Sequence, residues 1–296
     1  MKSGLILLNK SAGCTSFDAL YDIKKSLNTS KVGHTGTLDR FACGLLVILA
    51  GRALKLGRWF SHCDKKYEGR IHFGIETDTL DPEGKEIARA GLPSRKEIEE
   101  VLHQFTGEIM QEPPVYSAIH VNGQRASDLA REGKTPKMLK RAVTVYKLEL
   151  LSYTPPFADI FVHCSSGTYI RSLARDIALA AGSRAHLCGL LRTQVAGFKL
   201  GINNNDSGLP LCVLHPVDKY IISLLGMPYF EVTQREAKDI FHGKPLDSIV
   251  NGKILIKSDS NALCAKETAA VFFKDTLVAV IENKGNGWKY GCVFAE

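Results

Sequence analysis

Apolar residues in this chain switch repeatedly between strand spacing and helix spacing, and this alternation is the feature that most restricts its fold. Residues 67–73 place Tyr67, Gly69, Ile71 and Phe73 on one side and polar residues on the other, which indicates a half-buried strand. The short apolar runs 5–8, 45–50 and 160–162 indicate further strands. Amphipathic helices interleave with these strands, so the chain is expected to be an α/β (α+β) protein.

Four helices are predicted where a hydroxyl residue precedes apolar residues at helical spacing. The predicted N-caps are Ser16, Ser94, Thr168 and Thr233. Glu97 and Glu236 stand three residues after two of these caps and would complete capping boxes. In the first helix, Phe17 is expected on the buried stripe together with Leu20, Ile23 and Leu27.

Composition excludes several classes of protein. No apolar run is long enough to span a membrane, and the segment 1–8 is too short for a signal peptide. The eight cysteines form no CxxC pair, so zinc spacing is absent, and we expect reduced cysteines in a cytoplasmic protein. The net charge of +7 makes an anionic partner plausible without identifying it.

The most informative segment is the glycine-rich stretch 33–44, which carries one carboxylate, Asp39. Its three glycines permit tight turns and a close approach to a ligand. On pattern alone, a single aspartate after such a turn is more often a cap or a turn former than a catalytic group. The pattern therefore does not assign Asp39 a role.

Five segments, in order across about residues 4–198, resemble the motifs of the TruB family of pseudouridine synthases. The first two are LILLNKSAGCTSFDAL and VGHTGTLDRFACGLL, and the second is similar to the family signature GHxGxLDPxAxGxL. The others are KKYEGRIHFGIETDTLDPEG, PPVYSAIHVNGQRASDLAREG and SSGTYIRSLARDIALAAGSRAHLCGLLRT. The resemblance implies a mixed, largely antiparallel sheet flanked by helices.

The resemblance also implies a reaction. TruB enzymes detach uracil from its ribose, rotate it and rejoin it through carbon five, at position 55 in the T-loop of tRNA. They use one ionised aspartate, matched here by Asp39, and neither metal nor cofactor. A carboxylate can serve as a nucleophile and later as a leaving group. Whether it attacks the base, attacks ribose C1′ or first takes a proton stays open.

The other site residues come from the same resemblance. Tyr67 is expected to stack on the flipped uracil, Tyr169 and Leu190 to line the uracil pocket, and Arg171 to pair with the catalytic aspartate. His34 is expected to help fill the space left when the base flips out. Without the resemblance, Tyr67 would be a packing residue and His34 an ordinary loop histidine.

One departure from the family stands directly beside Asp39. Arg40 follows Asp39 where the family usually has proline, so it could hold Asp39 ionised, reach an RNA phosphate or point to solvent.

Asp78 and Asp81 suggest a fragment of a calcium loop, but no complete metal-binding pattern follows, so we expect turn acids. Asp81 matches a family acid with a structural role.

Two domains are expected, with a boundary near residue 226. Residues 1–226 would form the synthase domain, with a basic insertion at about 111–145 that grips the RNA stem-loop, and residues 201–210 would begin a linker. Residues 227–296 resemble a PUA domain, an RNA-binding module, with a turn at Asn251-Gly252.

The expected partner is the T-stem-loop of tRNA, bound by a monomer without a membrane or a guide RNA. One rival function is a guide-RNA-dependent synthase, although the chain lacks the long charged extensions that such a particle would use. The other rival is a tRNA-binding chaperone that needs no catalysis.

Overall fold

The computed structural model describes residues 2–201, 209–250, 253, 255–256, 267–283, 285 and 287–294. The chain divides into two compact units. The first comprises residues 1–39, 44–64 and 194–296, and the second comprises residues 40–43 and 65–193. The predicted linker entrance falls largely at residues 202–208 and the Asn251-Gly252 turn at 251–252, and both lie outside the described residues.

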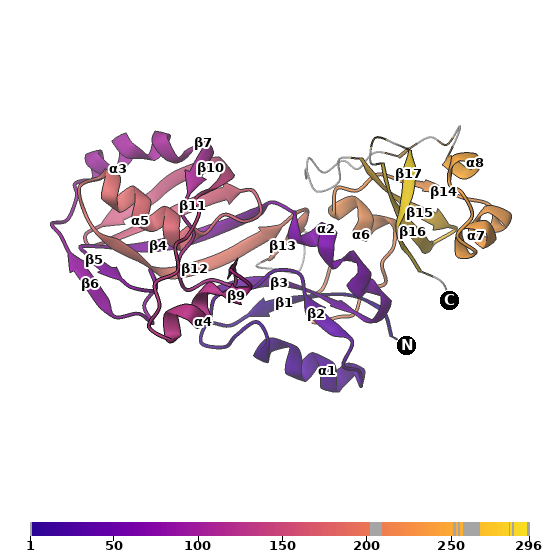
Figure 1. The fold of residues 1–296 in the computed structure, drawn as a ribbon, viewed down its shortest axis with the longest axis horizontal. Coiled ribbons are helices and arrows are strands. Elements are labelled where there is room, and N and C mark those ends of the chain that lie inside the picture. Colours follow the sequence, from indigo (N-terminus) through magenta and orange to yellow (C-terminus); the bar gives the residue numbers. More distant parts are fainter. Residues whose placement is uncertain are drawn as a thin grey trace. The chain divides into compact units, whose positions relative to one another are not determined.

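In the first unit, the strands near the N-terminus form an antiparallel arrangement around β3 (Figure 1). Its elements are β1 (Gly4–Lys10), α1 (Tyr21–Leu27), β2 (Val32–His34), β3 (Cys43–Ala50), α2 (Gly57–Ser61), β13 (Phe198–Lys199) and α6 (Lys219–Leu224). The strand β3 pairs with both β1 and β2. Seven of its eight residues are buried, which explains its continuous apolar sequence.

The same unit contains a separate four-stranded sheet in the order β14-β15-β16-β17. Its elements are β14 (Tyr229–Glu231), α7 (Gln234–Phe241), α8 (Asp247–Val250), β15 (Thr268–Phe273), β16 (Thr276–Asn283) and β17 (Trp288–Val293). Phe272 and Phe294 belong to the same buried cluster as Leu5 and Trp59. The C-terminal sheet and the N-terminal strands therefore share a hydrophobic core.

The second unit contains the strand order β12-β4-β11-β10-β7, antiparallel where β4, β11, β10 and β7 meet. Its strands are β4 (Lys65–Phe73), β5 (Ile75–Thr77), β6 (Glu86–Arg89), β7 (Gly107–Gln111), β8 (His120–Val121), β9 (Gln124–Arg125), β10 (Arg141–Thr154), β11 (Phe157–Cys164) and β12 (Ala185–Val195). Its helices are α3 (Arg95–Leu102), α4 (Ala126–Arg131) and α5 (Ile170–Ala180). The predicted mixed, largely antiparallel sheet is confirmed.

Helix α5 packs against β4 at a glycine. A Cβ atom added at Gly69 would lie 3.2 Å from Leu187 and 3.7 Å from Ile170. The strand has the predicted alternation, with Tyr67, Gly69, Ile71 and Phe73 buried. The absence of a side chain at Gly69 lets the first turn of α5 lie close to the sheet.

The capping boxes Ser94–Glu97 and Thr233–Glu236 are confirmed. The two predicted single caps are wrong. Thr168 donates its hydroxyl to the carbonyl of Ser165, and Tyr169 takes the N-cap position without a side-chain cap. In the first helical segment, Thr15 accepts from the N–H of Asp18, whereas Ser16 is buried in other contacts.

Six cysteines are free, as predicted, but Cys63 is disulfide-bonded, so the prediction of reduced cysteines is wrong there. None of the helices within the described ranges is long and apolar enough to span a bilayer. The basic segment 111–145 contains the short strands β8 and β9 and the helix α4.

Candidate active site

The glycine-rich loop leaves β2 after His34, and hydrogen bonds fix its backbone at Thr35 and at Leu38. Thr35 donates its N–H to the carbonyl of Val47 at 3.0 Å. Leu38 is buried, and the hydroxyl of Ser16 accepts from its N–H at 2.8 Å and donates to its carbonyl at 3.0 Å. Both backbone groups of the residue before Asp39 are therefore bound by one side chain.

Ser16 makes a contact that the sequence did not reveal. A serine two residues before an acid near a helix start is typical of an N-cap, which led to the wrong prediction. Its real partner, Leu38, is 22 residues away. Asp39 itself is half-buried at the end of this anchored segment.

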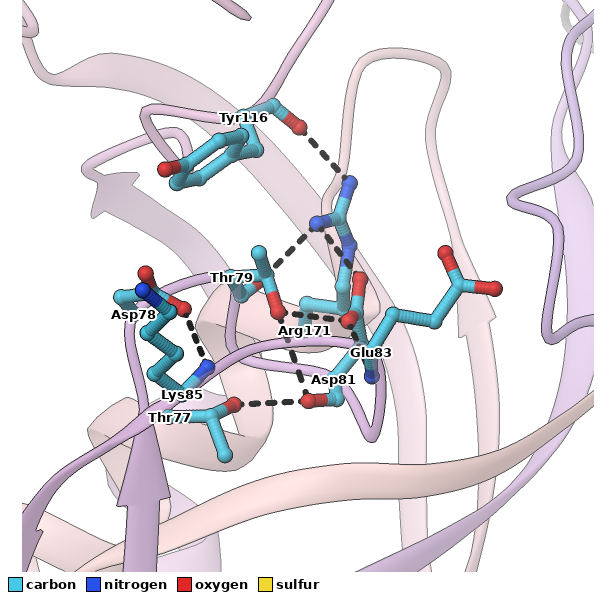
Figure 2. A network of polar contacts seen from close by, with 8 residues as sticks. All are labelled: Thr77, Asp78, Thr79, Asp81, Glu83, Lys85, Tyr116 and Arg171. Atoms are coloured by element: carbon cyan, nitrogen blue, oxygen red, sulfur yellow. Dashed lines mark hydrogen bonds and ion pairs between the residues drawn. The ribbon is translucent and has the colours of Figure 1, made fainter. Parts of the chain in front are cut away.

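In the second unit, a tight turn between β5 and β6 holds the carboxylate of Asp81 (Figure 2). Its Oδ1 accepts the hydroxyl of Thr79 at 2.5 Å and the N–H of Glu83 at 3.0 Å. Its Oδ2 accepts from Arg171 Nη1 at 3.1 Å. Asp78 accepts the N–H of Lys85 at 2.8 Å, so the prediction that these acids stabilise a turn is confirmed.

Arg171 joins this turn to two further backbone carbonyls. Its Nη1 also donates to the carbonyl of Thr79 at 2.8 Å, and its Nη2 donates to the carbonyl of Tyr116 at 3.0 Å. Figure 2 shows the guanidinium reaching between Tyr116 and the Asp81 turn. The side chains of Arg171 and Asp81 are only 5% and 9% exposed. A buried pair of this kind has a high cost if one partner is removed.

Arg171 is the second residue of α5, where the positive end of the helix dipole opposes a cation. A cation at this position is stabilised by an anionic partner. The structure supplies Asp81 as one such partner, 90 residues earlier in the chain. The expected pairing of Arg171 with Asp39 stays a prediction.

Tyr169 is fixed through its backbone by Gln111, the last residue of β7. The Gln111 amide accepts the Tyr169 N–H at 2.8 Å and donates to its carbonyl at 3.1 Å. Gln111 is buried, and the sequence gave no signal for this contact. These two hydrogen bonds therefore fix the start of α5, which carries Arg171 as its second residue.

Tyr67 and Leu190 are both buried and lie on the neighbouring strands β4 and β12. With Tyr169 and Arg171 they belong to the second unit. His34 pairs with Ile48 of β3 and, like Asp39, belongs to the first unit. The expected roles of these residues toward a base stay predictions.

Arg40 lies 3.9 Å from Glu83, and its side chain is 62% exposed. Glu83 is also the residue whose N–H binds Asp81. This contact is a weak surface ion pair, which leaves both the RNA-binding and the solvent-facing alternatives for Arg40 open.

Other charged residues of the second unit form short contacts with one another. On α5, Arg175 donates to Asp176 at 2.8 Å, while burial raises the pKa of Asp176 above its ordinary value. In the basic segment, Lys134 pairs with Glu132 at 2.7 Å. Across the described ranges, no group of three or more His, Cys, Asp or Glu side chains is arranged to hold a metal ion.

Comparisons with known proteins agree with this architecture. Residues 24–170 match the TruB family pseudouridylate synthase N-terminal domain. A "tRNA pseudouridine synthase B" of Borreliella burgdorferi is 46% identical over 203 residues, which are 68% of this chain and 72% of that protein. The protein of the same name from Treponema denticola is 41% identical over 256 residues, covering 78% of this chain and 72% of that one.

Solved structures extend the similarity in fold to the C-terminal sheet. A Cbf5-Nop10-Gar1 complex contains a chain with a TM-score of 0.67 and 25% identity, covering 95% of this chain and 78% of that one. An H/ACA RNP bound to a substrate RNA gives a TM-score of 0.66 over 99% of this chain and 85% of that one, at 23% identity. With relatives above 40% identity over two thirds of its length, the chain belongs to the TruB family of pseudouridylate synthases.

Proposed function

We propose that the chain isomerises uridine to pseudouridine in tRNA, at position 55 of the T-loop, as a stand-alone enzyme. The observation that carries this proposal is the anchored loop around Asp39, which lies inside the segment that matches the family. The names of the relatives from Borreliella burgdorferi and Treponema denticola support tRNA as the substrate.

In the proposed reaction, the bond between uracil N1 and ribose C1′ breaks and a bond between C5 and C1′ forms. The C5 proton leaves and N1 gains a proton, so the reaction is an isomerisation with no net exchange of electrons. The Asp39 carboxylate carries the reaction, either as a nucleophile toward the base or ribose C1′ that leaves again when the new bond forms, or as the group that first takes a proton. A target base flipped out of the loop makes the glycosidic bond accessible.

The remaining residues bind and orient the flipped base. Tyr67 stacks on the uracil, and Tyr169 and Leu190 line its pocket. Arg171, held by Asp81 and the Thr79 carbonyl, keeps the Asp39 carboxylate ionised. His34 helps fill the gap that the flipped base leaves in the T-loop.

The rest of the chain binds the RNA around this site. The basic segment 111–145 contacts phosphates of the stem-loop, and the sheet β14–β17 acts as a PUA-like RNA-binding domain that begins near residue 227. The protein works as a monomer in the cytoplasm, without metal, cofactor or guide RNA.

A guide-dependent reaction is the second candidate, because a Cbf5-Nop10-Gar1 complex shares the fold over 95% of this chain. One experiment separates the candidates. Purified full-length protein is incubated with unmodified tRNA in EDTA, without guide RNA, and pseudouridine is mapped. Formation at position 55, and its loss when that uridine is replaced by cytidine, supports the proposal. No pseudouridine, or pseudouridine only elsewhere, would refute it.

A further inference from the structure

Helix α1 and the 3-10 turn that precedes it (Asp18–Leu20) expose two aromatic rings on the surface of the unit that contains Asp39. Phe17 and Tyr21 are each 70% exposed. The sequence predicted Phe17 on the buried stripe of this helix, and that prediction is wrong. Leu20 is buried and Ile23 and Leu27 pack with it, so the buried face is complete without Phe17. Packing therefore does not explain why an aromatic residue stands at position 17.

Two lysines lie on the same side of the helix as the rings. Lys24 and Lys25 follow Tyr21 by three and four residues, the spacing that brings helical side chains together. The Lys24 ammonium lies 4.8 Å from the centre of the Phe17 ring. Within the described ranges, neither lysine is paired with a carboxylate, and the nearby Asp18 is engaged by Thr15.

This surface, formed by Phe17, Tyr21, Lys24 and Lys25, lies near the catalytic loop. Phe17 follows Ser16, and Ser16 holds Leu38, the residue before Asp39. Because consecutive Cα atoms lie about 3.8 Å apart, the Cα of Phe17 is within roughly 14 Å of the Cα of Asp39. Stacked nucleotides advance by about 3.4 Å each, so this distance corresponds to about four nucleotides.

We propose that Phe17, Tyr21, Lys24 and Lys25 form a second contact surface for the substrate RNA, on which an unpaired base stacks while the lysines bind flanking phosphates. The proposal rests on the proposed function, because an RNA whose target base reaches Asp39 brings neighbouring nucleotides within reach of α1. An aromatic ring can stack on any base, and two neighbouring ammonium groups complement the negative charge of the phosphate backbone. A purely apolar partner would leave the two lysines unmatched.

The test measures binding of unmodified tRNA to full-length protein across a series of salt concentrations. Phe17→Ala combined with Tyr21→Ala should weaken binding about fivefold or more without changing the salt slope, because no charge is lost. Lys24→Gln combined with Lys25→Gln should lower the salt slope by about one to two units. Tyr21→Phe should bind as the unaltered protein does.

Tyr220→Ala is the control, since this tyrosine is also exposed but lies on α6, outside the segments proposed to bind RNA. It should leave tRNA affinity unchanged. Unchanged affinity of the double alanine variant, in a protein that forms pseudouridine in tRNA, overturns this surface alone. Self-association of the unaltered protein that the double variant abolishes also overturns it, because a second copy would then cover the rings. If the unaltered protein neither binds nor modifies tRNA, the proposed function fails and the surface fails with it.

Discussion

Two aspartates, Asp39 and Asp81, differ in how deeply they are buried and in which contacts anchor the chain around them. At Asp81 the protein binds the carboxylate itself, through Thr79, the N–H of Glu83 and Arg171. At Asp39 the structure fixes the backbone of the preceding residue, through the hydroxyl of Ser16. Asp81 is also almost fully buried, whereas Asp39 is half-buried. An almost fully buried carboxylate bound on both oxygens stabilises a turn, whereas a half-buried carboxylate at the end of an anchored loop can reach a ligand.

The same substitution at the two positions should therefore separate activity from stability. Asp39→Asn is expected to abolish pseudouridine formation while the free energy of unfolding changes little and tRNA affinity stays within a few-fold. One carboxylate carries the covalent step, whereas phosphate contacts carry most of the binding. Mapping of pseudouridine after long incubation tests this, and measurable turnover by pure variant protein would remove Asp39 from the mechanism.

Arg171→Ala should reduce the single-turnover rate on saturating tRNA nearly as much as loss of Asp39. It removes the cation proposed to keep Asp39 ionised and leaves Asp81 buried without its charge partner. Arg171→Lys should restore activity only in part, because an ammonium cannot reach the Thr79, Asp81 and Tyr116 acceptors with a planar fork. A near-normal rate for the alanine variant would refute this role.

Asp81→Asn is the counterpart of Asp39→Asn, and its main effect should be on stability. It removes the buried charge that pairs with the Arg171 guanidinium in this turn, which should lower the free energy of unfolding by about 3 kcal/mol. Urea unfolding followed by circular dichroism measures the loss. If Asp81→Asn and Asp39→Asn are equally stable, the contrast between the two carboxylates is wrong.

The hydrogen bonds of these residues show which contacts could be predicted from the sequence and which could not. The capping boxes at Ser94 and Thr233 were predictable because both partners lie within three residues. Ser16 and Thr168 were wrongly predicted as caps because their hydroxyls bond elsewhere, in the case of Ser16 to a residue 22 positions away. The bonds of Arg171 to Asp81 and of Gln111 to Tyr169 span 90 and 58 residues, and no local pattern encodes them.

The C-terminal boundary near residue 226 was predicted from a change in sequence pattern, and it stays a prediction. The shared core has a practical consequence for testing it. Met227, Phe272 and Phe294 pack in one buried cluster with Leu5, so truncation at 226 would expose apolar surface of the remaining chain. Substitutions on the surface of the sheet β14–β17 are therefore a better test of its proposed RNA binding.

Ser16→Ala tests the backbone anchor of the Asp39 loop. The change removes two hydrogen bonds and leaves the buried N–H and carbonyl of Leu38 without this partner, which should cost about 1–3 kcal/mol of stability. The rate on saturating tRNA should fall as well, because the loop loses its fixed position. Ser26→Ala, at an exposed serine of α1, is the matched control and should leave both quantities unchanged. A stable, fully active Ser16→Ala variant would show that the loop is held by other contacts.

The smallest effect is expected for a substitution of Arg40. It follows Asp39 in the chain, and its guanidinium lies 3.9 Å from Glu83, beside the Asp81 turn. Because the pair is exposed, it should contribute less than about 1 kcal/mol to stability. Proline at this position would restrict the backbone of Asp39 to extended conformations, as in most of the family. Arg40→Pro should therefore keep the chemical step within about tenfold, a barrier change near 1.4 kcal/mol.

If Arg40 contacts an RNA phosphate, the same change should weaken tRNA binding and lower the salt slope by about one unit. Glu83→Gln sharpens the test, since it removes the competing acid and should strengthen tRNA binding while leaving the slope in place. An unchanged slope for Arg40→Pro would mean that Arg40 touches no phosphate and only faces solvent beside Glu83.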